Sequence, residues 1–152
     1  MRVTRIPNAL IVAAALSVSG VSGVFAQQPA TVGELIDKGG KKLGSEELTK
    51  LLSGSDVSGA CLSSPRFTCE VTYKKDGTLE GAVPGARNDN GSTVRFWGKW
   101  SANERGELCV DTQSNFGAPS QSCTHYFEFG GKYYHAINGD KAAPAYLREI
   151  RR

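Results

Sequence analysis

Apolar and polar residues follow two different periods along this chain. Three leucines, at positions 48, 51 and 52, recur at the three-to-four-residue spacing of one helix face. A serine and two glutamates precede them, which suits the positive end of a helix, and Gly54 suits its left-handed end. The pattern predicts a short amphipathic helix over residues 46–53, with Ser45 as the N-cap.

After residue 56 the apolar positions alternate with polar ones, which is typical of half-buried strands. Tight-turn pairs, each with a glycine, interrupt the alternation at Asp76-Gly77, Asn90-Gly91, Arg105-Gly106 and Gly130-Gly131. The predicted strands are residues 67–73, 78–83, 93–102, 107–112, 124–129 and 132–138.

Short strands joined by tight turns, without helical crossovers, predict a mainly β fold built as an antiparallel meander. A meander this long closes as a small up-and-down barrel, calycin-like in form, or folds over into a two-sheet sandwich. Both forms stay open at this point. We favour the barrel because it hides both sheet edges, with the one short N-terminal α-helix covering an end or a flank.

The first 26 residues predict a signal peptide. Arg2 and Arg5 precede an apolar run over residues 9–18, and Val24-Phe25-Ala26 provides small residues at a cleavage point. Serines and glycines dilute the run below the roughly 20 apolar residues of a membrane span. We therefore expect a periplasmic or secreted protein with no transmembrane segment after cleavage.

Composition divides the remainder into three parts. Residues 27–44 are rich in glycine and lysine and predict a flexible leader. Residues 45–140 predict a single β-domain, and residues 141–152, which end in several arginines, predict a solvated C-terminal tail. Loss of the first 26 residues leaves 16 Lys and Arg against 15 Asp and Glu, so the charge predicts no nucleic-acid partner.

The four cysteines predict two structural disulfides in an oxidising compartment. Three pairings are possible, and pairing across successive connections is geometrically easiest, which gives Cys61 with Cys69 and Cys109 with Cys123. The absence of C-x-x-C disfavours a zinc site. Alternation puts Cys109 with the polar face of its strand but Cys123 with the apolar face of the next. A bulge, or a cysteine that lies beyond the end of its strand, would reconcile them.

The chain carries no G-x-S-x-G, H-E-x-x-H, G-x-G-x-x-G or Walker sequence. Its only histidines are His125 and His135. A two-residue turn at Gly130-Gly131 pairs Phe129 with Lys132 and points the two histidines to opposite sides of the sheet. We therefore expect no enzyme activity, no catalytic residue, no metal and no cofactor.

One strand alternates Arg95, Trp97 and Lys99 against an apolar face. A tryptophan exposed between two cations is typical of a binding hot spot. We instead favour the alternative that the leucine helix covers Trp97, because that apolar stripe has to dock. Aromatic residues around the Gly-Gly turn form a second group, so the candidate binding surface comprises Arg95, Trp97, Lys99, Tyr126, Tyr133 and His135.

Several short motifs carry a resemblance: Leu48 to Gly54, Asp76-Gly77-Thr78, Gly98-Lys99-Trp100, Gly106-Glu107-Leu108-Cys109 and Cys123. In these the chain resembles small exported proteobacterial proteins of undetermined function, with a leucine helix followed by G-x-W and G-x-L-C strands. The resemblance implies a periplasmic or secreted β-domain and assigns no catalytic residue. The additional Cys61 and Cys69 pair and the long leader rich in glycine and lysine depart from that pattern.

These observations favour an exported, non-enzymatic binding module that acts on a protein or envelope component. One alternative is a secreted enzyme inhibitor of the lysozyme-inhibitor type, which uses the loop Ser114 to Ser122. Others are a carrier of a small apolar ligand, for which an internal cavity above about 300 Å³ is expected, and a hydrolase with an unrecognised site. The sequence leaves partner identity and oligomeric state open.

Overall fold

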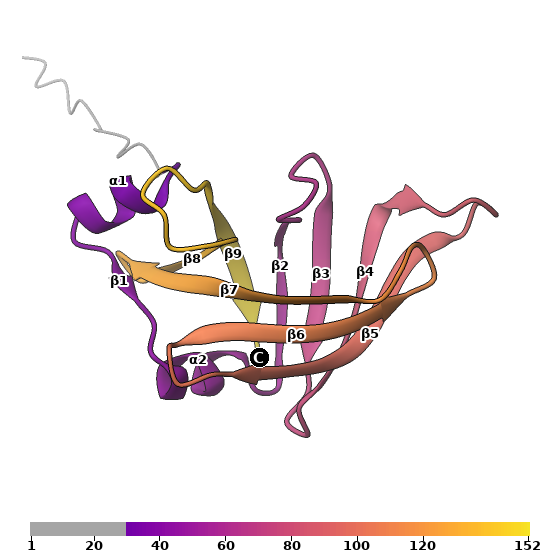
Figure 1. Cartoon of the computed structure of the whole chain (residues 1–152), viewed down its shortest axis with the longest axis horizontal. Coiled ribbons are helices and arrows are strands. Elements are labelled where there is room, and N and C mark those ends of the chain that lie inside the picture. Colours follow the sequence, from indigo (N-terminus) through magenta and orange to yellow (C-terminus); the bar gives the residue numbers. More distant parts are fainter. Residues whose placement is uncertain (1–29) are drawn as a thin grey trace, which may run out of the picture.

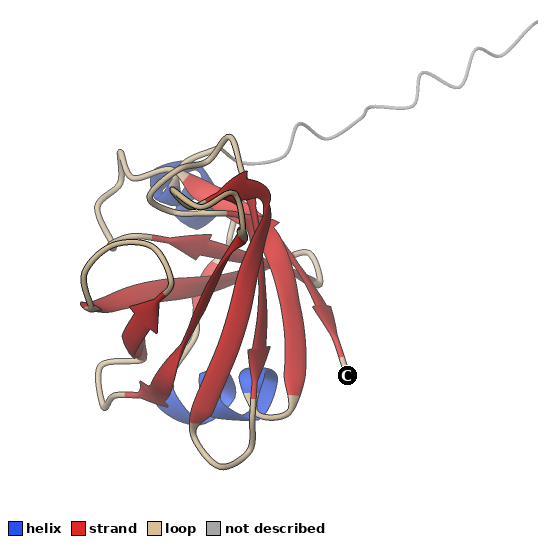
Figure 2. Cartoon of the chain, turned by 90° about the vertical axis from the view of Figure 1, so that its right-hand side faces the viewer, coloured by secondary structure: helices blue, strands red, loops and turns tan. Residues whose placement is uncertain are grey.

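A closed antiparallel β-barrel forms the body of the protein (Figures 1 and 2). We describe a computed structural model over residues 30–152, so the predicted signal peptide lies outside the described residues. The barrel strands are β2 (Ser55–Ala60), β3 (Thr68–Tyr73), β4 (Thr78–Arg87), β5 (Thr93–Ala102), β6 (Glu107–Ser114), β7 (Ser120–Phe129), β8 (Lys132–Ala136) and β9 (Ala145–Arg151). Each pairs with the next along the chain, and β9 pairs back with β2. The predicted mainly β fold is confirmed, and the closure is the barrel rather than the sandwich.

The hairpin of β7 and β8 shows how local sequence sets the register. Gly130 and Gly131 both adopt positive φ, 59° and 74°, which a two-residue turn of this kind requires and which glycine accepts readily. Phe129 therefore pairs with Lys132, as predicted. Because side chains alternate across the wall, this register decides which residues of both strands face the interior.

Helix α2 (Ser45–Leu52) lies at the lower end of the barrel in Figure 2. Its leucines join the interior core, which also includes Trp100, Leu108 and Tyr126. The predicted helix is confirmed, but its N-cap is Gly44, whose N–H donates to the Glu47 carboxylate at 2.9 Å. Ser45 instead donates its hydroxyl to the Ala102 carbonyl, which ties the helix to β5.

The prediction of a flexible leader is wrong for residues 30–44. This segment forms a second helix, α1 (Val32–Asp37), and a short strand, β1 (Lys41–Lys42), which pairs with β7. Thr31 and Glu34 form a capping box at the start of α1. The buried side chains of α1 pack outside the barrel wall in a second apolar cluster: Val32, Leu35, Phe127, Tyr134, Ala136, Ala143 and Ala145.

The prediction of a solvated C-terminal tail is also wrong. Residues 145–151 form β9, which fills the gap between β8 and β2 and closes the barrel. On this strand Leu147 packs with the outer cluster, Ile150 packs with the interior core, and Arg148 is buried. The arginines near the C-terminus led to the prediction of an exposed tail. Because side chains alternate along β9, one of these arginines, Arg148, points into the barrel. Strand β2 was likewise absent from the predicted strands.

Both predicted disulfides are formed, Cys61 with Cys69 and Cys109 with Cys123. Cys109 and Cys123 lie directly opposite each other on β6 and β7, in a register with no bulge between residues 107 and 112. Cys123 was expected on the inner face because it shares that face with Phe127. Phe127 in fact points outward and is buried under α1, so both cysteines lie on the outer face. Within residues 30–152 no helix is long and apolar enough to span a membrane.

Candidate functional site

The six candidate residues divide between the two sides of the barrel wall. Arg95, Trp97 and Lys99 lie on the outer face of β5, and all three are exposed, Trp97 by 47%. The favoured expectation that the leucine helix covers Trp97 is wrong. Those leucines pack into the barrel end, where the interior core offers a larger apolar surface than one tryptophan on the wall.

Trp97 borders a hollow of about 650 Å³ on the outside of β2, β3, β4 and β5. On the neighbouring strands Trp97 pairs with Glu80 and Gln113. The charged side chains lining the hollow are Asp56, Glu70, Glu80, Arg95 and Arg151. Neither Arg95 nor Lys99 forms an ion pair with any carboxylate of residues 30–152. The surface therefore presents an indole ring between two cations that are available to a partner.

Tyr126 and His135 do not belong to a binding surface, which corrects the candidate set. They pair across β7 and β8 on the inward face, and their rings stack with centroids 4.2 Å apart. Both are buried, Tyr126 completely. Tyr133, half-buried at the barrel end, packs against the interior core. The Gly-Gly turn that fixes this register also directs all three side chains inward.

Alternation along β9 brings Arg148, which the sequence analysis missed, into contact with His135. Arg148 Nε and Nη2 lie 3.3 Å and 3.2 Å from His135 Nδ1. His135 Nε2 lies 2.6 Å from the Thr124 hydroxyl, which donates to the Leu108 carbonyl. Burial, followed by the charge of Arg148, holds the pKa of His135 well below its usual value. His135 is therefore neutral and accepts from Arg148.

The interior beside this contact holds a cavity of about 120 Å³. Tyr73, Tyr126, His135, Arg148 and the Cys61 to Cys69 disulfide contribute to its lining. This volume is below the range of about 300–1,000 Å³ that is usual for pockets of drug-sized ligands. A carrier of a small apolar ligand was expected to have an internal cavity above about 300 Å³, and this cavity is smaller.

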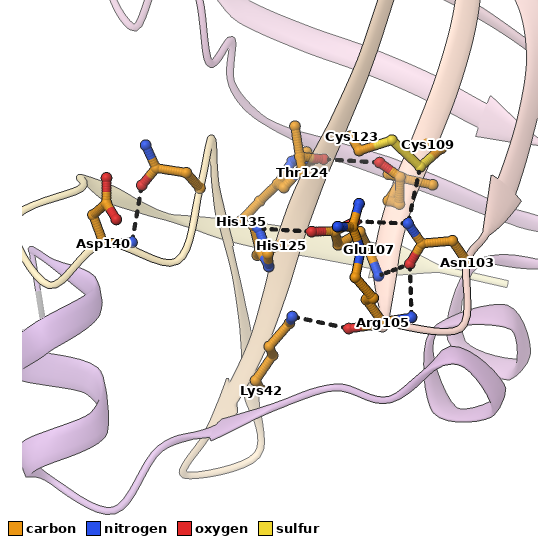
Figure 3. A network of polar contacts seen from close by, with 12 residues as sticks. Lys42, Asn103, Arg105, Glu107, Cys109, Cys123, Thr124, His125, His135 and Asp140 are labelled. Atoms are coloured by element: carbon orange, nitrogen blue, oxygen red, sulfur yellow. Dashed lines mark hydrogen bonds and ion pairs between the residues drawn. A yellow bond between two sulfur atoms is a disulfide. The ribbon is translucent and has the colours of Figure 1, made fainter.

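His125 belongs to a separate polar network on the outer face (Figure 3). Its Nε2 lies 3.6 Å from Glu107, whose carboxylate also accepts from Asn103 and pairs with Arg105. The pKa of Glu107 is lowered, first by the Asn103 hydrogen bond. The pKa of His125 is lowered by burial and by Lys42. These contacts brace the turn between β5 and β6, and the predicted separation of the two histidines is confirmed.

Glu107 also lies near the sulfurs of Cys109 and Cys123, a grouping that resembles a metal site. Both sulfurs are joined in the disulfide, so neither offers the thiolate that metals bind. The grouping is consequently part of the disulfide's surroundings.

The loop proposed for an inhibitor is shorter than expected, because β6 and β7 extend to leave only residues 115–119. Asn115 anchors it, with its side chain accepting from Arg95 N–H and donating to the Thr93 carbonyl. The next residue, Phe116, is 53% exposed. In Figure 1 the hairpin of β4 and β5 extends beyond the barrel on the same side.

No protein-family model matches the chain, and neither curated proteins nor solved structures give a significant match.

Proposed function

We propose that this protein is an exported, non-enzymatic binding module that holds a protein partner against the outer face of β5. The observation that carries this proposal is Trp97, which is half exposed between Arg95 and Lys99. Tryptophan and arginine are enriched among the residues that dominate binding energy. The partner's matching feature is an apolar side chain with a carboxylate beside it, over the indole and one of the two cations.

The rigidity of the surface supports this role. Strand β5 is hydrogen-bonded to β4 and β6 along most of its length, within a closed barrel. The backbone that carries Trp97 is ordered before it meets a partner, so binding costs no backbone entropy at this position. This favours Trp97 as an anchor over an aromatic residue on a mobile loop.

Two further observations support export and the absence of catalysis. The sequence predicts a signal peptide, and all four cysteines are paired, as is usual in oxidising compartments. The two histidines point to opposite sides of the wall, so they do not form a joint acid and base pair. The resemblance to small exported proteobacterial proteins agrees with this proposal.

A second candidate function is inhibition of a secreted enzyme, because Phe116 is exposed on a loop anchored by Asn115. Matched variants separate the two functions. Trp97→Ala and Phe116→Ala each remove an aromatic ring of similar exposure from different parts of the surface.

The test captures partners from the native envelope with the wild-type chain and then measures the affinity of the captured partner for both variants. We expect Trp97→Ala to weaken binding about thirtyfold, equivalent to about 2 kcal/mol, and Phe116→Ala to leave it nearly unchanged. The reverse order would support the inhibitor and reject the Trp97 surface. Equal affinities for all three chains would reject both.

A further inference from the structure

The barrel interior contains a positive charge without a counter-charge. Arg148 is only 8% exposed. Its guanidinium forms no ion pair with any carboxylate of residues 30–152. Its polar contacts there are with uncharged side chains, His135 through Nδ1 and Tyr126 through its hydroxyl. A buried charge is costly unless it is paired, so this arrangement calls for an anion that the described chain does not supply.

His135 does not provide that anion. Its contact with Thr124 places the ring proton on Nε2, because the Thr124 hydroxyl is already donating to Leu108. Nδ1 then carries the lone pair that accepts from Arg148. The imidazole is thus neutral, and it orients the guanidinium without balancing its charge.

Two buried polar atoms of the residues that line the cavity lack a hydrogen bond of normal geometry within residues 30–152. They are Arg148 Nη1 and the Tyr126 hydroxyl, and both are out of contact with solvent. The groups that interact with the Tyr126 hydroxyl are Tyr73 and Arg148 itself, and neither is an anion. Both residues line the cavity of about 120 Å³. Buried donors in native proteins are almost always satisfied, so two unsatisfied donors at one cavity indicate a missing acceptor.

Strand β2 provides the space for the guanidinium. A Cβ at Gly59 would lie 2.3 Å from Arg148 Nη1 and 2.6 Å from the Leu147 carbonyl oxygen. The residue type at position 59 therefore keeps the guanidinium free of the strand that faces it. Gly59 also has a positive φ of 157°, which favours glycine at this position independently of Arg148.

We infer that the interior cavity is a binding site for one small oxyanion, held by Arg148 Nη1 and the Tyr126 hydroxyl. An arginine fork beside a hydroxyl suits a carboxylate or phosphate oxygen. The cavity is slightly smaller than one of about 150 Å³ that admits benzene, so the anion has only a few heavy atoms. The site lies inside the wall, whereas Trp97 lies outside it, so neither proposal depends on the other.

The test uses the full chain with its disulfides formed, and sodium formate, acetate and phosphate as probes at constant ionic strength. We expect at least one probe to raise the Tm of the wild-type chain saturably by several degrees, because a ligand that binds only the folded state stabilises it. Arg148→Met should abolish the rise. Arg151→Met is the matched control, since it removes an exposed arginine of the same strand, and it should retain the rise.

A second measurement applies even if Arg148→Met fails to fold. With [2-¹³C]acetate in the wild-type chain, we expect nuclear Overhauser contacts from the acetate methyl group to the Tyr126 ring. A cavity that holds only water would give no such contacts and no saturable change in Tm with any probe, and this result would overturn the proposal. A rise of equal size in Arg148→Met would overturn it as well.

Discussion

Arg148 Nη2 lies 3.2 Å from His135 Nδ1 inside the barrel, and this contact joins β9 to β8 through side chains as well as through backbone hydrogen bonds. The pKa of His135 is held well below the usual value of 6.5, mainly by burial. The protonation state of one residue is thereby coupled to the integrity of the wall.

This coupling predicts the direction of the pH dependence of stability. As the pH falls below about 6.5, the unfolded chain binds a proton at His135 while the folded chain does not. The free energy of unfolding should then fall by up to about 1.4 kcal/mol per pH unit for this group. Denaturant unfolding between pH 5.5 and 7.5 measures the slope.

His125 has a lowered pKa as well and adds a slope of the same sign. His125→Gln isolates the contribution of His135, because these are the chain's only histidines. In this variant the stability should still fall toward pH 5.5. A flat profile, or an NMR titration that shows His135 ionising near pH 6.5, would contradict the prediction.

Gly59→Ala should destabilise the protein by about 1–3 kcal/mol, the usual cost of forcing extra atoms into a packed interior. The new Cβ would clash with Arg148 Nη1 and with the Leu147 carbonyl, and the positive φ of Gly59, 157°, adds backbone strain. Gly85→Ala is the control, because its nearest contact is 3.4 Å, to Phe67. Urea unfolding measures both, and equal effects would show that the space at position 59 is unimportant.

The two tryptophans should differ sharply in their contribution to stability. Trp100→Ala removes a buried ring that donates to the Lys74 carbonyl at 3.0 Å and packs edge-on against Tyr73, so we expect a loss of about 3–5 kcal/mol. Trp97→Ala removes a half-exposed ring and should cost less than about 1 kcal/mol. Denaturation followed by circular dichroism tests both, and a large loss in Trp97→Ala would assign Trp97 a structural role.

The two disulfides should be reduced in a defined order. Cys123 is exposed and Cys109 half-buried, whereas Cys61 is buried at the cavity. Thiol attack requires access, so a mild reductant should open Cys109 to Cys123 first. Alkylation followed by mass spectrometry of the native chain identifies the first pair, and prior labelling of Cys61 would contradict the exposure argument.

Loss of the Cys109 to Cys123 bond should also lower stability. The bond closes a loop of 15 residues, for which chain entropy predicts about 3 kcal/mol. A Cys109→Ser, Cys123→Ser double variant measures this cost by urea unfolding. A variant as stable as the wild type would show that β6 and β7 need no covalent link.

The strands that could be predicted from the sequence are those whose turns are encoded locally. The Gly130-Gly131 turn fixed the register of β7 and β8 without reference to the rest of the chain. Strand β9 was not predicted, for two reasons. Its pairing with β2 exists only once the barrel is closed, and its inward-pointing residues include Arg148. An alternation rule that expects apolar residues inside cannot recognise a buried arginine.

The candidate site was predicted only in part, for a related reason. The pattern placed Arg95, Trp97 and Lys99 on one face of β5, but it could not say what covers that face. Whether α2 covers Trp97 depends on where its leucines can bury the most apolar surface. That surface is the barrel interior, which is formed by strands distant in sequence. The interior oxyanion site depends on the same closure.

The seam between β2 and β9 also bears on how the protein reaches its native state. It joins Val57 to Ile150, so the longest loop of the barrel has to be closed before these strands pair. Contacts between residues so far apart form slowly, and until then the chain is an open sheet with two unprotected edges. We therefore expect the interval before closure to be the period in which the chain most needs protection from aggregation.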